Sequence, residues 1–105
     1  MPTLDPDGPQ PPASGGLPTR ELKIINRRGL HARASAKFVQ TVERFDSDVT
    51  VTRSGETVGG RSIMGLLTLG AAQGTSIVVT AKGTDATLCL QAIDDLLANR
   101  FGEDE

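Results

Sequence analysis

The sequence predicts an α+β fold, an open-faced two-layer sandwich in which three helices cover one face of a four-stranded, mostly antiparallel sheet. Apolar residues alternate with polar ones in four segments and recur at helical spacing in three others. These segments follow the order strand, helix, strand, strand, helix, strand, helix. The expected strands are residues 21–25, 48–53, 56–60 and 76–81, and the expected helices are residues 32–45, 63–69 and 85 to about 100.

Local signals justify these elements. The apolar stripe of the first helix consists of Ala34, Phe38, Val42 and Phe45, with Val39 beside it. Ser54-Gly55 is a typical hairpin turn between the second and third strands. Ser62 stands directly before the second helix, where its oxygen can accept from the first turn, and Gly70 marks the end of that helix. Thr84 is predicted to cap the third helix.

Residues 1–19 differ in composition from the rest of the chain. All six prolines and three of the glycines lie here, and such a stretch buries too little apolar surface to offset the entropy of ordering. It lacks the basic start and apolar run of a signal peptide. We predict a disordered extension, with a proline-rich docking ligand as the alternative, followed by one domain over residues 20–105.

Composition argues against several classes of protein. Aromatic residues make up 3% of the chain, which leaves no stacking platform for nucleic acid. No apolar run is long enough to cross a membrane. The single cysteine, Cys89, cannot form an internal disulfide, which favours a reducing cytoplasm, and we expect it to be a small core residue.

Charge is balanced over the predicted domain but unevenly placed. Asp5 and Asp7 account for the formal net charge of −2, so residues 20–105 carry eleven basic and eleven acidic side chains. The basic residues near His31 are Arg27, Arg28, Arg33 and Lys37. The acidic residues toward the C-terminus are Asp94, Asp95, Glu103, Asp104 and Glu105. A local basic face indicates an acidic partner or an anion rather than nucleic acid.

His31, the only histidine, stands where a strand pattern changes to a helix pattern. A helix start offers unpaired backbone N–H groups that can hold a phosphoryl group, and Arg33 supplies a planar set of donors for phosphate oxygens. The alternative is a histidine that merely caps the helix. A metal site is poorly supported because there is no second histidine, and no serine shows a nucleophile-elbow pattern.

Two segments resemble one known family. Gly29-Leu30-His31-Ala32-Arg33, followed by Ala36-Lys37-Phe38-Val39, is similar to the phosphorylation segment of the histidine-containing phosphocarrier (HPr) family of the bacterial phosphoenolpyruvate-dependent phosphotransferase system. The second segment, residues 61–70, resembles the regulatory-serine segment of the same family. The resemblance covers about residues 20–101, and two motifs in register are far more specific than either alone.

The resemblance implies a phosphoryl relay rather than an enzyme, with no cofactor and no metal. Enzyme I would phosphorylate the δ1 nitrogen of His31 with Arg33 as the companion residue, and His31 would pass the group to an EIIA-type acceptor. Most family members have proline after that arginine, whereas this chain has Ala34. Because alanine is an excellent helix former, we expect the helix start to survive with a less rigid entry. A site that serves several partners suggests a monomer.

The resemblance also implies that Ser62 is a target of HPr kinase/phosphorylase. A phosphate there would repel acidic partners of His31. Ile63, Met64 and Leu67 are candidates for the apolar part of the partner surface, Met64 above all, although each could instead lie in the core. The alternative function is a purely regulatory module for nitrogen or carbon control that docks through the Ser62 helix, and a sugar-uptake or a nitrogen-regulatory branch stays open.

Overall fold

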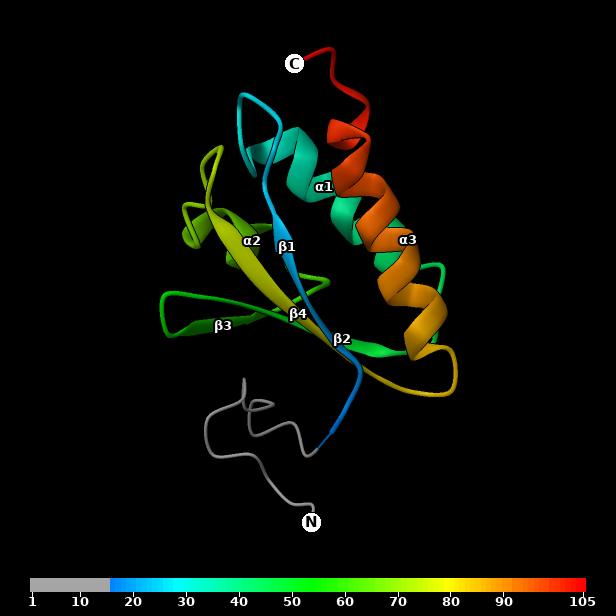
Figure 1. The fold of residues 1–105 in the computed structure, drawn as a ribbon. Coiled ribbons are helices and arrows are strands. Elements are labelled where there is room, and N and C mark those ends of the chain that lie inside the picture. The colour runs from blue at the N-terminus through cyan, green and yellow to red at the C-terminus, as the bar shows by residue number, and fades with distance from the viewer. Residues whose placement is uncertain (1–15) are drawn as a thin grey trace, which may run out of the picture.

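The computed structural model describes residues 16–105 (Figure 1), so most of the predicted extension, residues 1–15, lies outside the described part of the chain. The strands are β1 (Thr19–Lys23), β2 (Asp48–Arg53), β3 (Glu56–Gly59) and β4 (Ser76–Lys82). The helices are α1 (Ala32–Val42), α2 (Ile63–Thr68), α3 (Ala86–Ala98) and a short 3-10 helix at Arg100–Gly102. This order agrees with the predicted one.

The four strands form one sheet in the order β1-β4-β2-β3, and every neighbouring pair is antiparallel. In the central strands Val51 stands opposite Val79, and Leu22 of β1 stands opposite Ile77. These side chains are buried, whereas their neighbours along each strand are more exposed. The sheet therefore buries one face against the helices, as the predicted open-faced sandwich requires.

The core between sheet and helices is aliphatic apart from Cys89 and two buried phenylalanines. α1 and α3 pack against each other over the sheet (Figure 1), and α2 contributes the fully buried Leu66. Cys89 of α3 is a buried core residue, as predicted, and burial raises the pKa of its thiol. No helix within residues 16–105 combines the length and hydropathy needed to cross a membrane.

Several element ends differ from the predictions by one to three residues, and three of these differences have a clear physical cause. β1 begins at Thr19, two residues early, because it pairs with β4 from Thr19 opposite Thr80 onward. α1 ends at Val42 rather than at residue 45. The N–H groups of Arg44 and Phe45 donate to carbonyls three residues earlier, those of Thr41 and Val42, so the chain there forms 3-10 turns rather than α-helix. Phe45 still packs against the core.

The third correction concerns the start of α3, where Asp85 and not Thr84 is the N-cap residue. The Asp85 carboxylate does not bond its own helix. It accepts the hydroxyl of the buried Ser47 at 2.5 Å and the Asp46 N–H at 2.9 Å. The loop at Asp46 and Ser47 therefore binds the Asp85 carboxylate, which does not cap α3.

Asp85 predicts a pH-dependent contribution to stability. The hydrogen bonds from Ser47 and Asp46 hold the pKa of Asp85 below its ordinary value of about 3.9. A carboxyl with a lowered folded pKa stabilises the fold above its unfolded pKa, and this contribution is lost as pH falls through the folded pKa. We expect Asp85→Asn to lower the urea midpoint at pH 7, with the difference from wild type shrinking below pH 4.

The control is Asp48→Asn, because the Asp48 carboxylate makes no hydrogen bond or ion pair within residues 16–105. Its urea midpoint should stay close to that of the wild type at both pH values. Equal losses in the two variants would contradict a specific contribution from Asp85.

Candidate functional site

A tight loop places His31 at the start of α1. Gly29 has φ +69, and a Cβ built on it would lie 2.6 Å from the Ala71 oxygen. The adjacent Leu30 donates its N–H to that oxygen at 2.9 Å, and the Gly29 N–H donates to the backbone carbonyl of Asn26 at 3.2 Å. Only glycine fits this left-handed, closely packed position, so the loop before His31 is held against the segment that follows α2.

His31 is the N-cap residue of α1. Its backbone is extended, with φ −77 and ψ −176, and its carbonyl accepts the Ser35 N–H at 2.8 Å. The ring makes no capping bond, so the alternative of a merely capping imidazole is wrong. The N–H groups of residues 32–34 have no partner within the described chain. Ala34 is buried in the first turn, and the helix begins there as expected despite the missing proline.

The His31 ring is bound to a carboxylate from the other end of the chain. Nε2 forms a hydrogen bond with Oε2 of Glu103, and both side chains are less than one-fifth exposed. Oε1 of Glu103 accepts the amide of the buried Asn26 at 3.1 Å. Desolvation alone would raise the pKa of Glu103. The bonds from His31 and Asn26 and the charge of Arg28 outweigh it and hold that pKa below its ordinary value.

Glu103 arrives there because the chain turns sharply after α3 and bends across toward the loop before α1 (Figure 1). Arg100, Phe101 and Gly102 all have positive φ angles, of 54, 55 and 79. Phe101 is buried with 1% exposure, and its carbonyl accepts the ammonium of Lys37 at 2.6 Å. We call residues 100–105 the C-terminal return segment. Its fold brings the last acidic residues back over the basic loop before α1.

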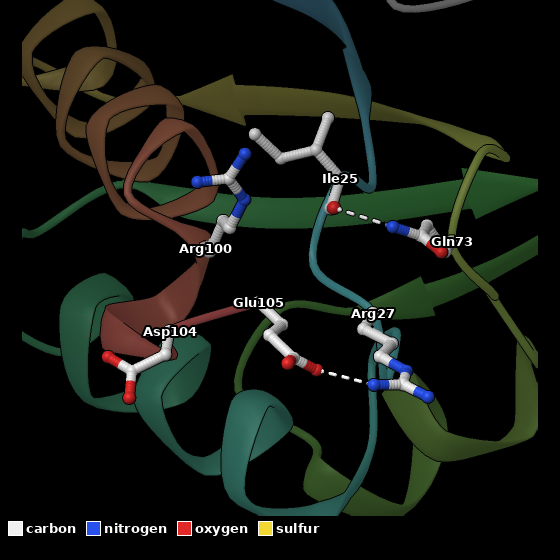
Figure 2. Close-up of a pocket in the computed structure, with 6 residues that line it drawn as sticks. All are labelled: Ile25, Arg27, Gln73, Arg100, Asp104 and Glu105. Carbon is white, nitrogen blue, oxygen red and sulfur yellow. Dashed lines mark hydrogen bonds and ion pairs between the residues drawn. The ribbon is translucent and has the colours of Figure 1, made fainter.

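An ion pair fixes the end of this segment. The Arg27 guanidinium lies 2.7 Å from the Glu105 side-chain carboxylate. In addition, the backbone N–H of Arg27 donates to the backbone oxygen of Glu105 at 2.8 Å. Figure 2 shows this pair on one side of an open pocket of about 380 Å³. Across the pocket, Gln73 donates to the Ile25 carbonyl at 3.2 Å. This pocket borders the histidine site, but neither His31 nor Arg33 lines it.

The neighbouring cavity, of about 410 Å³, brings together the predicted basic cluster. Arg28, Arg33 and Lys37 line it together with Glu103 and the other acidic residues of the C-terminal return segment. Arg33 is exposed and makes no hydrogen bond or ion pair within residues 16–105. A free guanidinium and unpaired N–H groups at one helix start can together receive an anion with several oxygen atoms.

Two members of the site, Glu103 and Asn26, were not predicted from the sequence. Each looks ordinary in its own segment, since one is part of an acidic run and the other of a turn. The separation of basic residues near His31 from acidic residues near the C-terminus was the available signal. Opposite charges of this kind predict that the two ends meet, although they do not say which carboxylate reaches the ring.

Ser62 is the N-cap of α2, as predicted. Its Oγ accepts the Gly65 N–H at 2.9 Å, and its carbonyl accepts the Leu66 N–H at 3.0 Å. A Cβ on Gly65 would lie 3.0 Å from this Oγ and from a carbon of Val58, so glycine allows the close approach. The Ser62 residue is exposed, which leaves its hydroxyl accessible.

The apolar candidates beside Ser62 separate into exposed and buried side chains. Met64 is 70% exposed and Ile63 is 40% exposed, so neither is a core residue. Leu67 is half-buried, and the core position of α2 belongs to Leu66. The expected exposure of Met64 is therefore confirmed.

Comparison with known proteins gives consistent matches. Residues 18–99 match the family model described as "PTS HPr component phosphorylation site". Proteins named phosphocarrier protein HPr from Xylella fastidiosa and Neisseria meningitidis are each 48% identical, over 80% and 82% of this chain and 94% and 97% of theirs. A solved HPr structure from Thermoanaerobacter tengcongensis superimposes with a TM-score of 0.81 at 37% identity, covering 85% of this chain and all of that one.

Proposed function

We propose that His31 carries the phosphoryl group in this chain, which belongs to the HPr family of phosphocarrier proteins of the phosphotransferase system. The observation that carries the proposal is the position of the ring. It caps no helix, yet it stands at the start of α1 beside three unpaired backbone N–H groups and the unpaired Arg33 within the described chain. These donors suit a dianionic group bound to the imidazole.

The proposed reaction is a direct transfer between nitrogen atoms. With Nε2 engaged by Glu103, Nδ1 is the ring atom available for attack. A bond forms between Nδ1 and phosphorus while the bond from phosphorus to the donor nitrogen breaks, and the donor keeps that electron pair. Phosphoryl transfer passes through a loose transition state that needs positioning and charge stabilisation, which Arg33 and the helix start supply.

The proposed partners are phosphorylated enzyme I as donor and an EIIA-type domain as acceptor. Membership of a phosphotransferase component family supports both, and the exposed Arg33, unpaired within residues 16–105 and two residues after His31, suits an acidic partner surface. We propose a monomeric relay with a phosphohistidine intermediate. The buried lone thiol of Cys89 supports a reducing cytoplasm as its location. The matches to phosphocarriers do not favour the purely regulatory module.

The direct test is incubation with phosphoenolpyruvate and enzyme I. We expect one acid-labile phosphate per chain, located on His31 by peptide mapping under alkaline conditions. Arg33→Ala should take up the same final amount more slowly, because it removes charge stabilisation and leaves the nucleophile. An unlabelled wild-type protein, or phosphate on another residue, would overturn the proposal.

We further propose that Ser62 is a regulatory phosphorylation site for HPr kinase/phosphorylase, with Ile63, Met64 and Leu67 on the partner-facing surface. The exposed capping hydroxyl and the exposed Met64 support it. A phosphate at this helix start can keep a favourable interaction with the backbone N–H groups, so α2 need not unfold. ATP and the kinase should give an acid-stable phosphate that is absent in Ser62→Ala.

Charge at position 62 should slow phosphorylation of His31. Aspartate and asparagine both cap helices well, but only aspartate adds a negative charge. We expect Ser62→Asp to reduce kcat/KM with enzyme I roughly 5-fold, equivalent to about 1 kcal/mol. Ser62→Asn is the matched control and should react at the wild-type rate. Equal rates for the two variants would refute charge repulsion as the mechanism.

A further inference from the structure

We propose that Glu103 is a positioning residue for phosphoryl transfer: it holds His31 in the tautomer that carries its lone pair on Nδ1 and balances the charge that the ring gains during reaction. This proposal rests on the proposed function of His31 and extends it. The residue lies 72 positions away in the sequence, on the C-terminal return segment. No local pattern around His31 includes it.

The tautomer follows from the chemistry of the contact. An ionised carboxylate is only an acceptor, and the hydrogen bonds and nearby charge that lower the pKa of Glu103 keep it ionised. A hydrogen bond between its Oε2 and His31 Nε2 therefore requires that Nε2 carry the proton. Because a neutral imidazole has only one N–H, the lone pair lies on Nδ1. Glu103 thus selects the nitrogen that can attack phosphorus.

The contact between Glu103 and His31 also stabilises the phosphorylated form of the ring. When Nδ1 bonds phosphorus, no proton leaves, so a ring with hydrogen on Nε2 becomes a phosphorylated imidazolium with one positive charge. Glu103 places a negative charge against that N–H from a site where both side chains are mostly shielded from water. When the acceptor takes the phosphoryl group, the N–P electron pair returns to Nδ1 and the neutral tautomer is restored.

Asn26 and the buried Phe101 hold Glu103 in position. Its second oxygen accepts the Asn26 amide, which also donates to the Gly29 carbonyl at 2.8 Å. Asn26 is fully buried, yet its Oδ1 has no partner within residues 16–105. Burying an amide oxygen without a partner costs free energy. The two hydrogen bonds that the Asn26 amide donates offset this cost, and one of them holds Glu103. Behind Glu103, the buried Phe101 anchors the backbone.

The test compares Glu103→Gln with Asp104→Asn. Both variants remove one negative charge from the same segment, but Asp104 has no hydrogen bond or ion pair within the described chain. A glutamine amide can accept from or donate to Nε2, so it does not select a tautomer. Ring ¹⁵N NMR at pH 8.5 needs no assignment, because His31 is the only histidine.

We expect wild type and Asp104→Asn to show His31 protonated only on Nε2, and Glu103→Gln to show a mixture with Nδ1–H. The kcat for phosphorylation by enzyme I should fall roughly 10-fold in Glu103→Gln with KM nearly unchanged. An unchanged tautomer, an unchanged or faster rate, or an equal loss in Asp104→Asn would overturn the proposal. The tautomer measurement uses unphosphorylated protein, so it can fail or succeed independently of the proposed phosphorylation of His31.

Discussion

His31→Ala is expected to take up no acid-labile phosphate from phosphoenolpyruvate and enzyme I, a complete loss rather than a slower reaction. Phosphoryl transfer needs a nucleophilic atom at the start of α1, and His31 is the only imidazole in the chain. Arg33 and the backbone N–H groups can hold phosphate oxygens, but they cannot form the covalent bond. The measurement is the amount of acid-labile phosphate per chain after prolonged incubation.

The loss must be separated from unfolding. Because the His31 ring makes no capping bond, its removal should leave α1 in place, and far-ultraviolet circular dichroism should match that of the wild type. The Glu103 carboxylate loses one donor but keeps the Asn26 amide, so the urea midpoint should fall only modestly. Acid-labile phosphate persisting on a folded His31→Ala protein would show that another residue carries the group.

Phe101→Ala is expected to cause the largest loss of stability. The ring is 1% exposed and belongs to the core, although it lies beyond the end of α3. Truncating a buried phenylalanine to alanine costs about 3–5 kcal/mol, a large share of the roughly 5–15 kcal/mol that stabilises a small domain. The melting temperature should fall by more than about 10 °C.

Circular dichroism is the suitable probe for Phe101→Ala, because the chain contains neither Trp nor Tyr. Leu88→Ala provides the control, since that side chain is 68% exposed and its loss should change the free energy of unfolding by less than about 0.5 kcal/mol. A cost below about 1 kcal/mol for Phe101→Ala would mean that the ring does not anchor the C-terminal return segment.

The elements could be predicted because their signals are local. The alternation around Val49 and Val51 and the helical stripe through Phe38 reflect burial on one face, and β2 has the predicted bounds. Element boundaries that depend on contacts with distant residues could not be predicted in the same way. α1 tightens before Phe45, and Asp85 caps α3 without bonding it because a distant loop takes its carboxylate.

Some residues of the site could likewise be predicted from local sequence, and others could not. His31 and Ser62 could be placed at helix starts from neighbouring residues alone, and both are N-cap residues in the structure. Glu103 could not, because its role depends on the turn at Phe101 and on a hydrogen bond to a residue 72 positions away in the sequence. Sequence patterns report which face of an element is buried, whereas the partner of a single polar atom depends on the whole fold.

The turn after α3 also determines where further sequence can be joined to this domain. Glu105 is held against Arg27, so an affinity tag or a second domain attached after it would emerge beside the His31 ring. β1 begins at the opposite end of the sheet (Figure 1), and a fusion entering there would leave the ring accessible to donor and acceptor. Tethering for binding or transfer measurements is therefore best made through the N-terminal side.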